Sequence, residues 1–153
     1  MTFLLDLNLL LILHDPLHPH YKLVSRWFAH RTSRRFATCP ITQSGFIRLL
    51  TRGIAGLAPM EMAEARSALE HLVQQPGHVF WPDTPTWPNA TKSLFARMQG
   101  HRQTTDAYLL GLAIHNHGKL ATLDRGIRHL AGQEFAANVE IIEQSAPARA
   151  PVG

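Results

Sequence analysis

The sequence predicts an α/β domain in which a mainly parallel sheet is covered by helices on both faces. Short apolar runs typical of buried strands alternate with longer segments of helical periodicity, and this alternation favours parallel strands joined by crossover helices. The chain has 153 residues, of which 45% are hydrophobic, and a chain of this size can bury one substantial core. We therefore expect a single domain over residues 1–144 and a flexible, Pro- and Ala-rich tail over residues 145–153.

Five segments are predicted to be strands because each is a short apolar run bounded by polar or turn-forming residues. They are residues 3–6, 35–39, 78–81, 119–123 and 139–143. Helices are predicted at residues 9–13, 20–31, 42–52, 60–75, 90–99, 105–117 and 125–131. Pro16 and Pro19 separate the first two helices, and Pro40 precedes the third. Gly118 is the expected left-handed residue after the helix at 105–117.

Cysteine usage and the amino-terminal segment exclude several protein classes. Cys39 is the only cysteine, so no internal disulfide and no cysteine-based zinc module can form. The apolar segment 1–13 lacks a basic region and a small-residue cleavage site, and Asp6 and Asn8 interrupt it. It is therefore predicted to be core rather than a signal peptide or a membrane span. We expect a cytoplasmic protein that does not bind a membrane.

The basic excess of the chain is mostly arginine. Lys and Arg number 15 against 11 Asp and Glu, a formal net charge of +4, and twelve of the 15 are Arg. The planar guanidinium suits phosphate, so this bias favours a nucleic-acid partner. The candidates for contact with an RNA backbone are Arg31, Arg34, Arg35 and Arg48.

Three of the five aspartates interrupt strongly apolar runs, where a carboxylate is costly unless something pairs with it. Asp6 and Asp124 each end a predicted strand, and ligands bind at the carboxyl edge of parallel sheets. Asp106 is predicted to lie in the first turn of a helix capped by Thr104 or Thr105, on its buried side. Capping alone would explain Asp106 but not the other two. Because helix starts lie at that same edge, the three carboxylates can converge.

A second helix start repeats this pattern at Gln43. Phe46, Ile47 and Leu50 follow Gln43 at +3, +4 and +7, the spacing that Leu109, Leu110 and Ala113 have from Asp106. The polar head of Gln43 is therefore expected to face the same cleft.

Converging carboxylates with no evident Lys or Arg partner predict a hard divalent cation, Mg²⁺ or Mn²⁺, with Asp6, Asp106 and Asp124 as ligands. Such an ion lowers the pKa of a bound water and neutralises the charge of a phosphodiester. The leading chemical hypothesis is therefore a metal-dependent nuclease.

Three segments of the chain resemble the PIN-domain ribonucleases, and among them the VapC-type toxins of bacterial toxin–antitoxin pairs. They are LLDLNLL, CPITQSGFIRLLT and GHRQTTDAYLLGLAIHNHGKLATLDRGI, which lie between residues 3 and 127. The resemblance implies a small three-layer α/β/α sandwich, a Mg²⁺ or Mn²⁺ site, endonucleolytic cleavage of RNA, a homodimer, and inhibition by a cognate antitoxin. It matches Asp6, Asp106 and Asp124 to the acidic site residues of the family, with Asn8 and Thr122 as supporting polar groups.

One position departs from the family pattern, because Gln43 stands where a Glu is usual. No other acidic residue lies between Asp15 and Glu61 to replace it. The Gln carbonyl accepts hydrogen bonds but brings no charge, so we expect weaker metal binding, especially of a second ion. This departure keeps open a PIN-like domain that binds RNA or a partner without catalysis. A PIN nuclease of RNA processing without an antitoxin is a further alternative.

Overall fold

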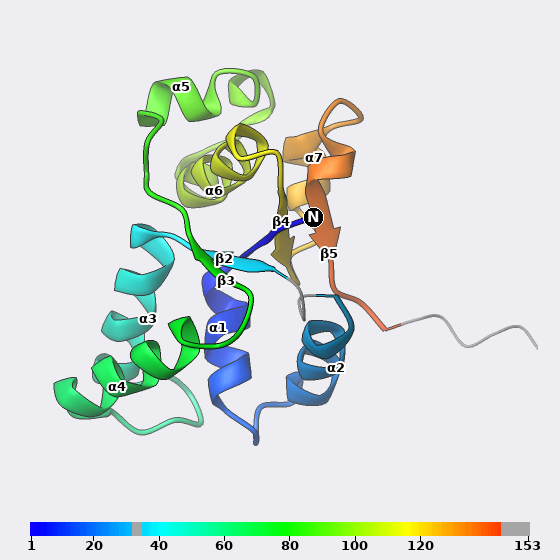
Figure 1. The fold of residues 1–153 in the computed structure, drawn as a ribbon. Coiled ribbons are helices and arrows are strands. Elements are labelled where there is room, and N and C mark those ends of the chain that lie inside the picture. The colour runs from blue at the N-terminus through cyan, green and yellow to red at the C-terminus, as the bar shows by residue number, and fades with distance from the viewer. Residues whose placement is uncertain (32–34, 145–153) are drawn as a thin grey trace, which may run out of the picture.

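The computed structural model describes residues 1–31 and 35–144, with only the backbone of Arg31 at the end of the first range (Figure 1). The predicted tail, 145–153, lies outside the described residues. All five predicted strands are present, each one or two residues shorter than expected: β1 Phe3–Leu5, β2 Phe36–Thr38, β3 His78–Phe80, β4 Lys119–Thr122 and β5 Val139–Ile141.

The five strands form one sheet in the order β3-β2-β1-β4-β5, and every neighbouring pair is parallel. The chain starts in the middle of the sheet, adds β2 and β3 on one side of β1, and then crosses back to place β4 and β5 on the other side. The order therefore reverses between β1 and β4, and such a switch point opens a crevice at the carboxyl ends of the two strands.

Helices cover both faces of the sheet, as predicted. On one face lie α1 Leu7–His14, α2 Tyr21–Arg31 and α3 Pro40–Arg52, with α4 Met62–Val73 packed on α3. On the other lie α5 Trp87–Thr91, α6 Thr104–His115 and α7 Ile127–Ala131 (Figure 1). The strands alternate accordingly: Phe3 and Leu5 are buried in the core under α1, and Leu4 is buried in the core under α6. The predicted three-layer sandwich is confirmed.

The helix predicted at 90–99 is wrong. Helix α5 begins earlier, because Pro88 is favourable in the first turn, and it ends at Thr91. A separate 3-10 turn follows at Phe95–Arg97. Leu94 is fully buried, and Arg97 Nε donates to the carbonyl of Leu130 at 2.8 Å. These tertiary contacts bend the chain where local periodicity favoured one continuous helix.

Two predictions for the ends of α6 also need correction. The residue before α6 is Gln103, in a 3-10 turn His101–Gln103, so neither Thr104 nor Thr105 is the cap. At the other end His117, with φ 53°, is the left-handed residue, and Gly118 is the next residue, whose N–H donates to Ala113 O at 2.8 Å.

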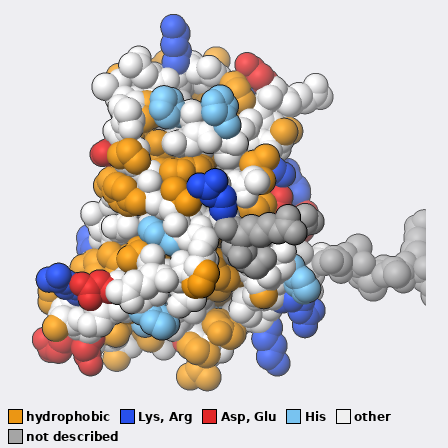
Figure 2. Space-filling view, viewed as in Figure 1, with side chains coloured by type: hydrophobic (Ala, Val, Ile, Leu, Met, Phe, Trp, Pro, Cys, Tyr) orange, Lys and Arg blue, Asp and Glu red, His pale blue; other side chains and the backbone are white. Residues whose placement is uncertain are grey.

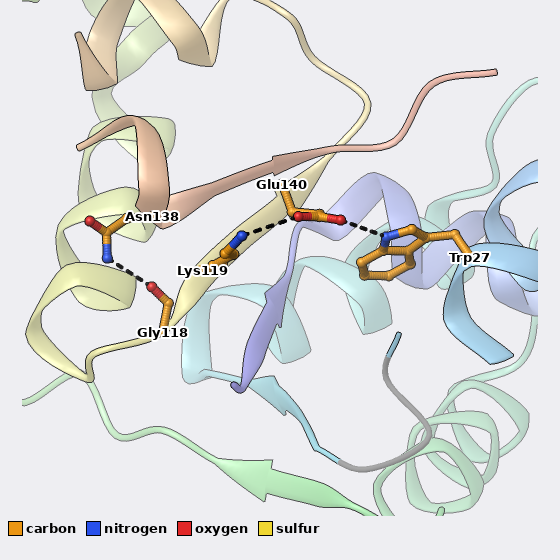
Figure 3. Close-up of polar contacts among 5 residues, drawn as sticks. All are labelled: Trp27, Gly118, Lys119, Asn138 and Glu140. Atoms are coloured by element: carbon orange, nitrogen blue, oxygen red, sulfur yellow. Dashed lines mark hydrogen bonds and ion pairs between the residues drawn. The ribbon is translucent and has the colours of Figure 1, made fainter. Parts of the chain in front are cut away.

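Gly118 is needed for a different reason, the close approach of other groups. A Cβ at this position would lie 2.5 Å from the ring of Trp81 and 2.7 Å from the carbonyl oxygen of Thr2. The carbonyl of Gly118 also accepts a hydrogen bond from Asn138 Nδ2 at 2.9 Å (Figure 3). The amino end of β4 is thereby joined to the turn before β5.

Polar contacts also join α2 to β4 and β5. Glu140 on β5 accepts from Trp27 Nε1 at 3.3 Å and pairs with Lys119 Nζ at 3.4 Å (Figure 3). The three residues come from α2, β4 and β5, so this half-buried cluster joins α2 to the edge of the sheet that β5 forms. In the described ranges, no helix combines the length and apolar character that crossing a membrane requires.

The contact between α5 and α6 gives a test of the packing. A Cβ at Gly111 would lie 2.1 Å from the carbonyl oxygen of Ala90, a backbone atom that cannot rotate away. We predict that Gly111→Ala lowers the free energy of unfolding by about 2 kcal/mol, because the overpacking outweighs the gain in helix propensity. Urea denaturation measures the change.

The matched control is Gly100→Ala, where no atom lies within 4 Å of the added Cβ. It should leave stability close to that of the wild type. A Gly111→Ala protein as stable as the wild type would contradict the close approach of the two helices.

Candidate active site

The pairing of β1 with β4 brings two of the predicted site residues to neighbouring positions. Leu5 lies opposite Ala121 in the parallel register, and Asp6 directly follows Leu5. The backbone N–H of Asp6 donates to the carbonyl of Ala121 at 3.0 Å, which extends the pairing to the end of the strand. Asp124 follows β4 by two residues. Both carboxylates therefore lie at the crevice where the strand order reverses.

Thr122 connects these two residues. Its hydroxyl donates to Asp6 Oδ2 at 2.9 Å and accepts from the backbone N–H of Asp124 at 3.0 Å. The Thr122 side chain is buried, so its orientation is set by this pair of hydrogen bonds. Asp124 Oδ1 in turn accepts from the N–H of Gly126 at 2.8 Å, and Oδ2 takes no part in this hydrogen bond.

Asp106 approaches from the helix layer. It lies in the first turn of α6, half-buried, as its spacing predicted. The pKa of this carboxyl is raised to about 6, mostly by burial and in addition by the nearby charges of Asp6 and Asp124. The pKa of Asp6 is also raised by burial, against the opposing effect of hydrogen bonds from Thr122 and the Leu7 backbone. Asp6 and Asp124 thus lie close enough to Asp106 to destabilise its charged form, and Asp124 has the same effect on Asp6.

As the side chains lie in residues 1–31 and 35–144, no group of three or more His, Cys, Asp or Glu is placed so that it could hold a metal ion. The ion pairs found among these residues involve none of the three aspartates. The structure therefore holds a cluster of like charge without a basic partner in its described part. Carboxylate oxygens of this kind suit Mg²⁺ or Mn²⁺, and a cation would relieve their repulsion.

Gln43 lies in the first turn of α3, at the same carboxyl edge of the sheet. Its amide Nε2 donates to the hydroxyl of Thr38 at 2.8 Å, and that hydroxyl also contacts His78 Nε2 at 2.8 Å. Sequence reasoning missed Thr38 and His78. A polar residue at the end of a buried strand could have indicated Thr38, but nothing local links His78 to Gln43.

The remaining predicted residues lie in different parts of the molecule. Asn8 is exposed in the first turn of α1, and Arg48 is exposed on α3. Arg35 directly precedes β2, so it lies at the amino edge of the sheet, opposite the carboxylates. This position argues against Arg35 as a contact for RNA bound at the aspartates. Arg34 lies outside the described residues, and of Arg31 only the backbone, at the end of α2, is described.

Two arginines that were not selected from the sequence lie beside the carboxylates along the chain. Arg102 is exposed in the 3-10 turn before α6, four residues from Asp106. Arg125 follows Asp124 and pairs with Glu143 at 3.1 Å. On the face shown in Figure 2, basic side chains are dispersed and do not form one continuous patch.

Comparisons with known proteins give consistent results. Residues 3–133 match the family of the PIN domain. The chain is similar to Ribonuclease VapC29 of Mycobacterium tuberculosis, with 39% identity over 132 residues covering 86% of this chain and 92% of the relative. It is 33% identical to Ribonuclease VapC39 of the same organism over 142 residues, 93% of this chain and 100% of the relative.

A solved structure has a similar fold. It is the crystal structure of VapBC2 from Rickettsia felis bound to a DNA fragment from their promoter, with a TM-score of 0.61 at 12% sequence identity. The similarity covers 85% of this chain and 93% of that chain. At this level of identity the likeness concerns the fold alone.

The raised pKa of Asp106 predicts a pH-dependent stability in the absence of metal. Because its folded-state pKa, about 6, lies above the ordinary value of 3.8 for an aspartate, the folded protein binds the proton more tightly, and stability falls as pH rises from about 4 to about 6. Asp106→Asn removes this loss, so the variant should be more stable than the wild type above pH 6 and lose that advantage near pH 4.

Urea denaturation in EDTA across this pH range measures the difference. Added Mg²⁺ should stabilise the wild type more than Asp106→Asn and so reverse the order at neutral pH. The exposed Asp83 supplies the matched control, because Asp83→Asn should keep the full response to Mg²⁺. An advantage of Asp106→Asn that stays constant with pH would contradict the assignment.

Proposed function

This chain is a PIN-domain protein of the VapC ribonuclease family, and we propose that it is a Mg²⁺- or Mn²⁺-dependent endoribonuclease that acts as the toxin of a toxin–antitoxin pair. The observation that carries the proposal is the group of three carboxylates at the β1–β4 switch point, where Asp6 and Asp124 raise the pKa of Asp106 and Asp124 raises that of Asp6. Such a group is unfavourable by itself and becomes favourable when it binds a cation.

In this proposal Asp6, Asp106 and Asp124 hold the ion. When bound there, the ion would activate a water and neutralise the negative charge of the phosphodiester. The hydroxyl of Thr122 keeps the Asp6 carboxylate in one orientation, and the N–H of Gly126 does the same for Asp124. Each therefore needs little reorganisation on binding. Gln43 contributes an uncharged oxygen, and exposed Asn8 is a supporting group on the first turn of α1.

RNA is the proposed substrate, as the names of the similar ribonucleases suggest. Arg102 and Arg125 are the arginines we propose to hold its phosphates, because each is adjacent in the chain to a segment that carries a site aspartate. Arg48 on α3 is a more distant candidate. The family membership further supports a cognate antitoxin and a homodimer as partners, which co-purification with the antitoxin and light scattering would test.

The principal alternative is a PIN domain that binds RNA without cleaving it. The observation that favours it is Gln43, which leaves the site with one carboxylate fewer than the usual family pattern. All three aspartates are nevertheless present, in positions where burying a carboxylate is energetically unfavourable, and this favours the enzyme. The two hypotheses differ in whether purified protein cleaves RNA when Mg²⁺ is added.

We predict that Asp6→Asn and Asp124→Asn each reduce the rate of Mg²⁺-dependent RNA cleavage by more than about 100-fold, because each removes a charged ligand rather than an outer-sphere partner. Gel analysis of structured RNAs incubated with and without Mg²⁺ measures the rates. Asp83→Asn, an exposed carboxylate outside the cluster, should cleave at the wild-type rate. Cleavage that persists in EDTA, or full activity of Asp6→Asn, would exclude the proposed mechanism.

Gln43→Glu tests the departure from the family pattern. The added carboxylate should lower the Mg²⁺ concentration needed for half-maximal cleavage by about tenfold, because one more negative charge attracts the ion in a partly buried site. A titration of activity against Mg²⁺ measures it. If the Mg²⁺ dependence and the rate stay unchanged, position 43 does not belong to the site.

A further inference from the structure

A chain of three hydrogen-bonded side chains leads from an edge strand of the sheet to Gln43. His78 comes from β3, Thr38 from β2 and Gln43 from α3. Thr38 has no exposed surface, and its hydroxyl lies 2.8 Å from both Gln43 Nε2 and His78 Nε2. Thr38 is two residues after Phe36, which is buried in the core beneath α3, so its side chain points to the same side.

Donors and acceptors in this chain can be assigned from their chemistry. The amide nitrogen of Gln43 can only donate, so the hydroxyl oxygen of Thr38 accepts. The proton of the buried hydroxyl must itself find an acceptor. The remaining neighbour at hydrogen-bonding distance is His78 Nε2, which accepts only when the imidazole carries its single proton on Nδ1. Burial lowers the pKa of His78, which favours this neutral ring.

We propose that Thr38 and His78 are positioning residues that fix the orientation of the Gln43 amide, and this inference rests on the proposed function of the site. With its NH₂ group bound to Thr38, Gln43 directs its carbonyl oxygen away from Thr38, where it can accept from a water of the ion or face the ion itself. A flipped amide would present a donor that repels a cation. The chain of hydrogen bonds thus lets an uncharged Gln offer the oxygen that a Glu would offer.

The same assignment predicts how His78 responds to a substitution at position 43. A carboxylate cannot donate, so in Gln43→Glu the hydroxyl of Thr38 must donate to position 43. His78 can then keep its hydrogen bond only by carrying the proton on Nε2. The neutral ring therefore changes tautomer, from Nδ1–H in the wild type to Nε2–H in Gln43→Glu.

Nitrogen-15 NMR of the His78 ring tests this change on metal-free protein at a pH where the ring is neutral. The expected result is an unprotonated Nε2 in the wild type and a protonated Nε2 in Gln43→Glu. The same tautomer in both proteins would overturn the proposal. Because this measurement needs neither RNA nor metal, it decides the hydrogen-bond assignment even if the wild type cleaves no RNA, a result that would overturn the proposed function instead.

The positioning role is tested by Thr38→Val, which keeps the shape of the side chain and removes the hydroxyl. Calorimetric titration with Mg²⁺ alone should show a dissociation constant about tenfold higher than that of the wild type, the size expected for losing one well-formed hydrogen bond. Thr38→Ser, which retains a hydroxyl, should restore the affinity. Thr91→Val is the matched control, since Thr91 is also buried but bonds to Trp87 O in α5.

Urea denaturation of the same variants separates positioning from folding. Thr38→Val and Thr91→Val should both remain folded, and only Thr38→Val should bind Mg²⁺ more weakly. Unchanged Mg²⁺ affinity in Thr38→Val, or an equal loss in Thr91→Val, would show that Thr38 does not position Gln43.

Discussion

The parallel pairing of β1 with β4 is the constraint on which the rest of the site depends. Only because Leu5 lies opposite Ala121 does Asp6 reach the hydroxyl of Thr122, and through it the backbone of Asp124. Asp6 and Thr122 are 116 residues apart in the chain. A shift of one residue in this register would turn every side chain of β1 to the opposite face and separate the two carboxylates. The register of the buried residues of β1 and β4 therefore also places the carboxylates of the proposed site.

The carboxylate cluster lowers the stability of the fold when no ligand is bound. Burial and mutual repulsion raise the pKa values of Asp6 and Asp106, so their charged forms work against folding. A ligand that binds the folded state at such a site raises the stability again. Where a Glu is usual in the family, Gln43 adds no further negative charge to this repulsion, and in the proposed function it attracts a second cation less strongly. In our proposal, the hydrogen bonds through Thr38 to His78 fix the orientation of the neutral Gln43 amide, so that its oxygen and not its NH₂ group faces the carboxylates.

Much of the fold could be predicted because its strands are short, strongly apolar and separated by helical segments. All five strands and the two covered faces follow from that pattern, and the positions of Asp6 and Asp124 follow from the strand ends. Errors occurred where a distant contact outweighed local preference. Burial of Leu94 and the bond from Arg97 to Leu130 O interrupt the helix expected at 90–99. Gly118 is required by the ring of Trp81 and not by a left-handed backbone.

The α/β class and the family could be read from the sequence, and so could the placing of Asp6 and Asp124 at strand ends and of Asp106 at a helix start, because these depend on periodicity and local motifs. Tertiary structure alone decided which groups orient the site. Gln43 bonds to Thr38 on β2, and Thr38 in turn contacts His78 on β3, a neighbour that only the pairing of these two strands supplies. The direction of β2 also places Arg35, which precedes this strand, at the amino edge of the sheet, opposite the carboxylates. Such relations depend on which strands become neighbours, and this is set by packing over the whole core.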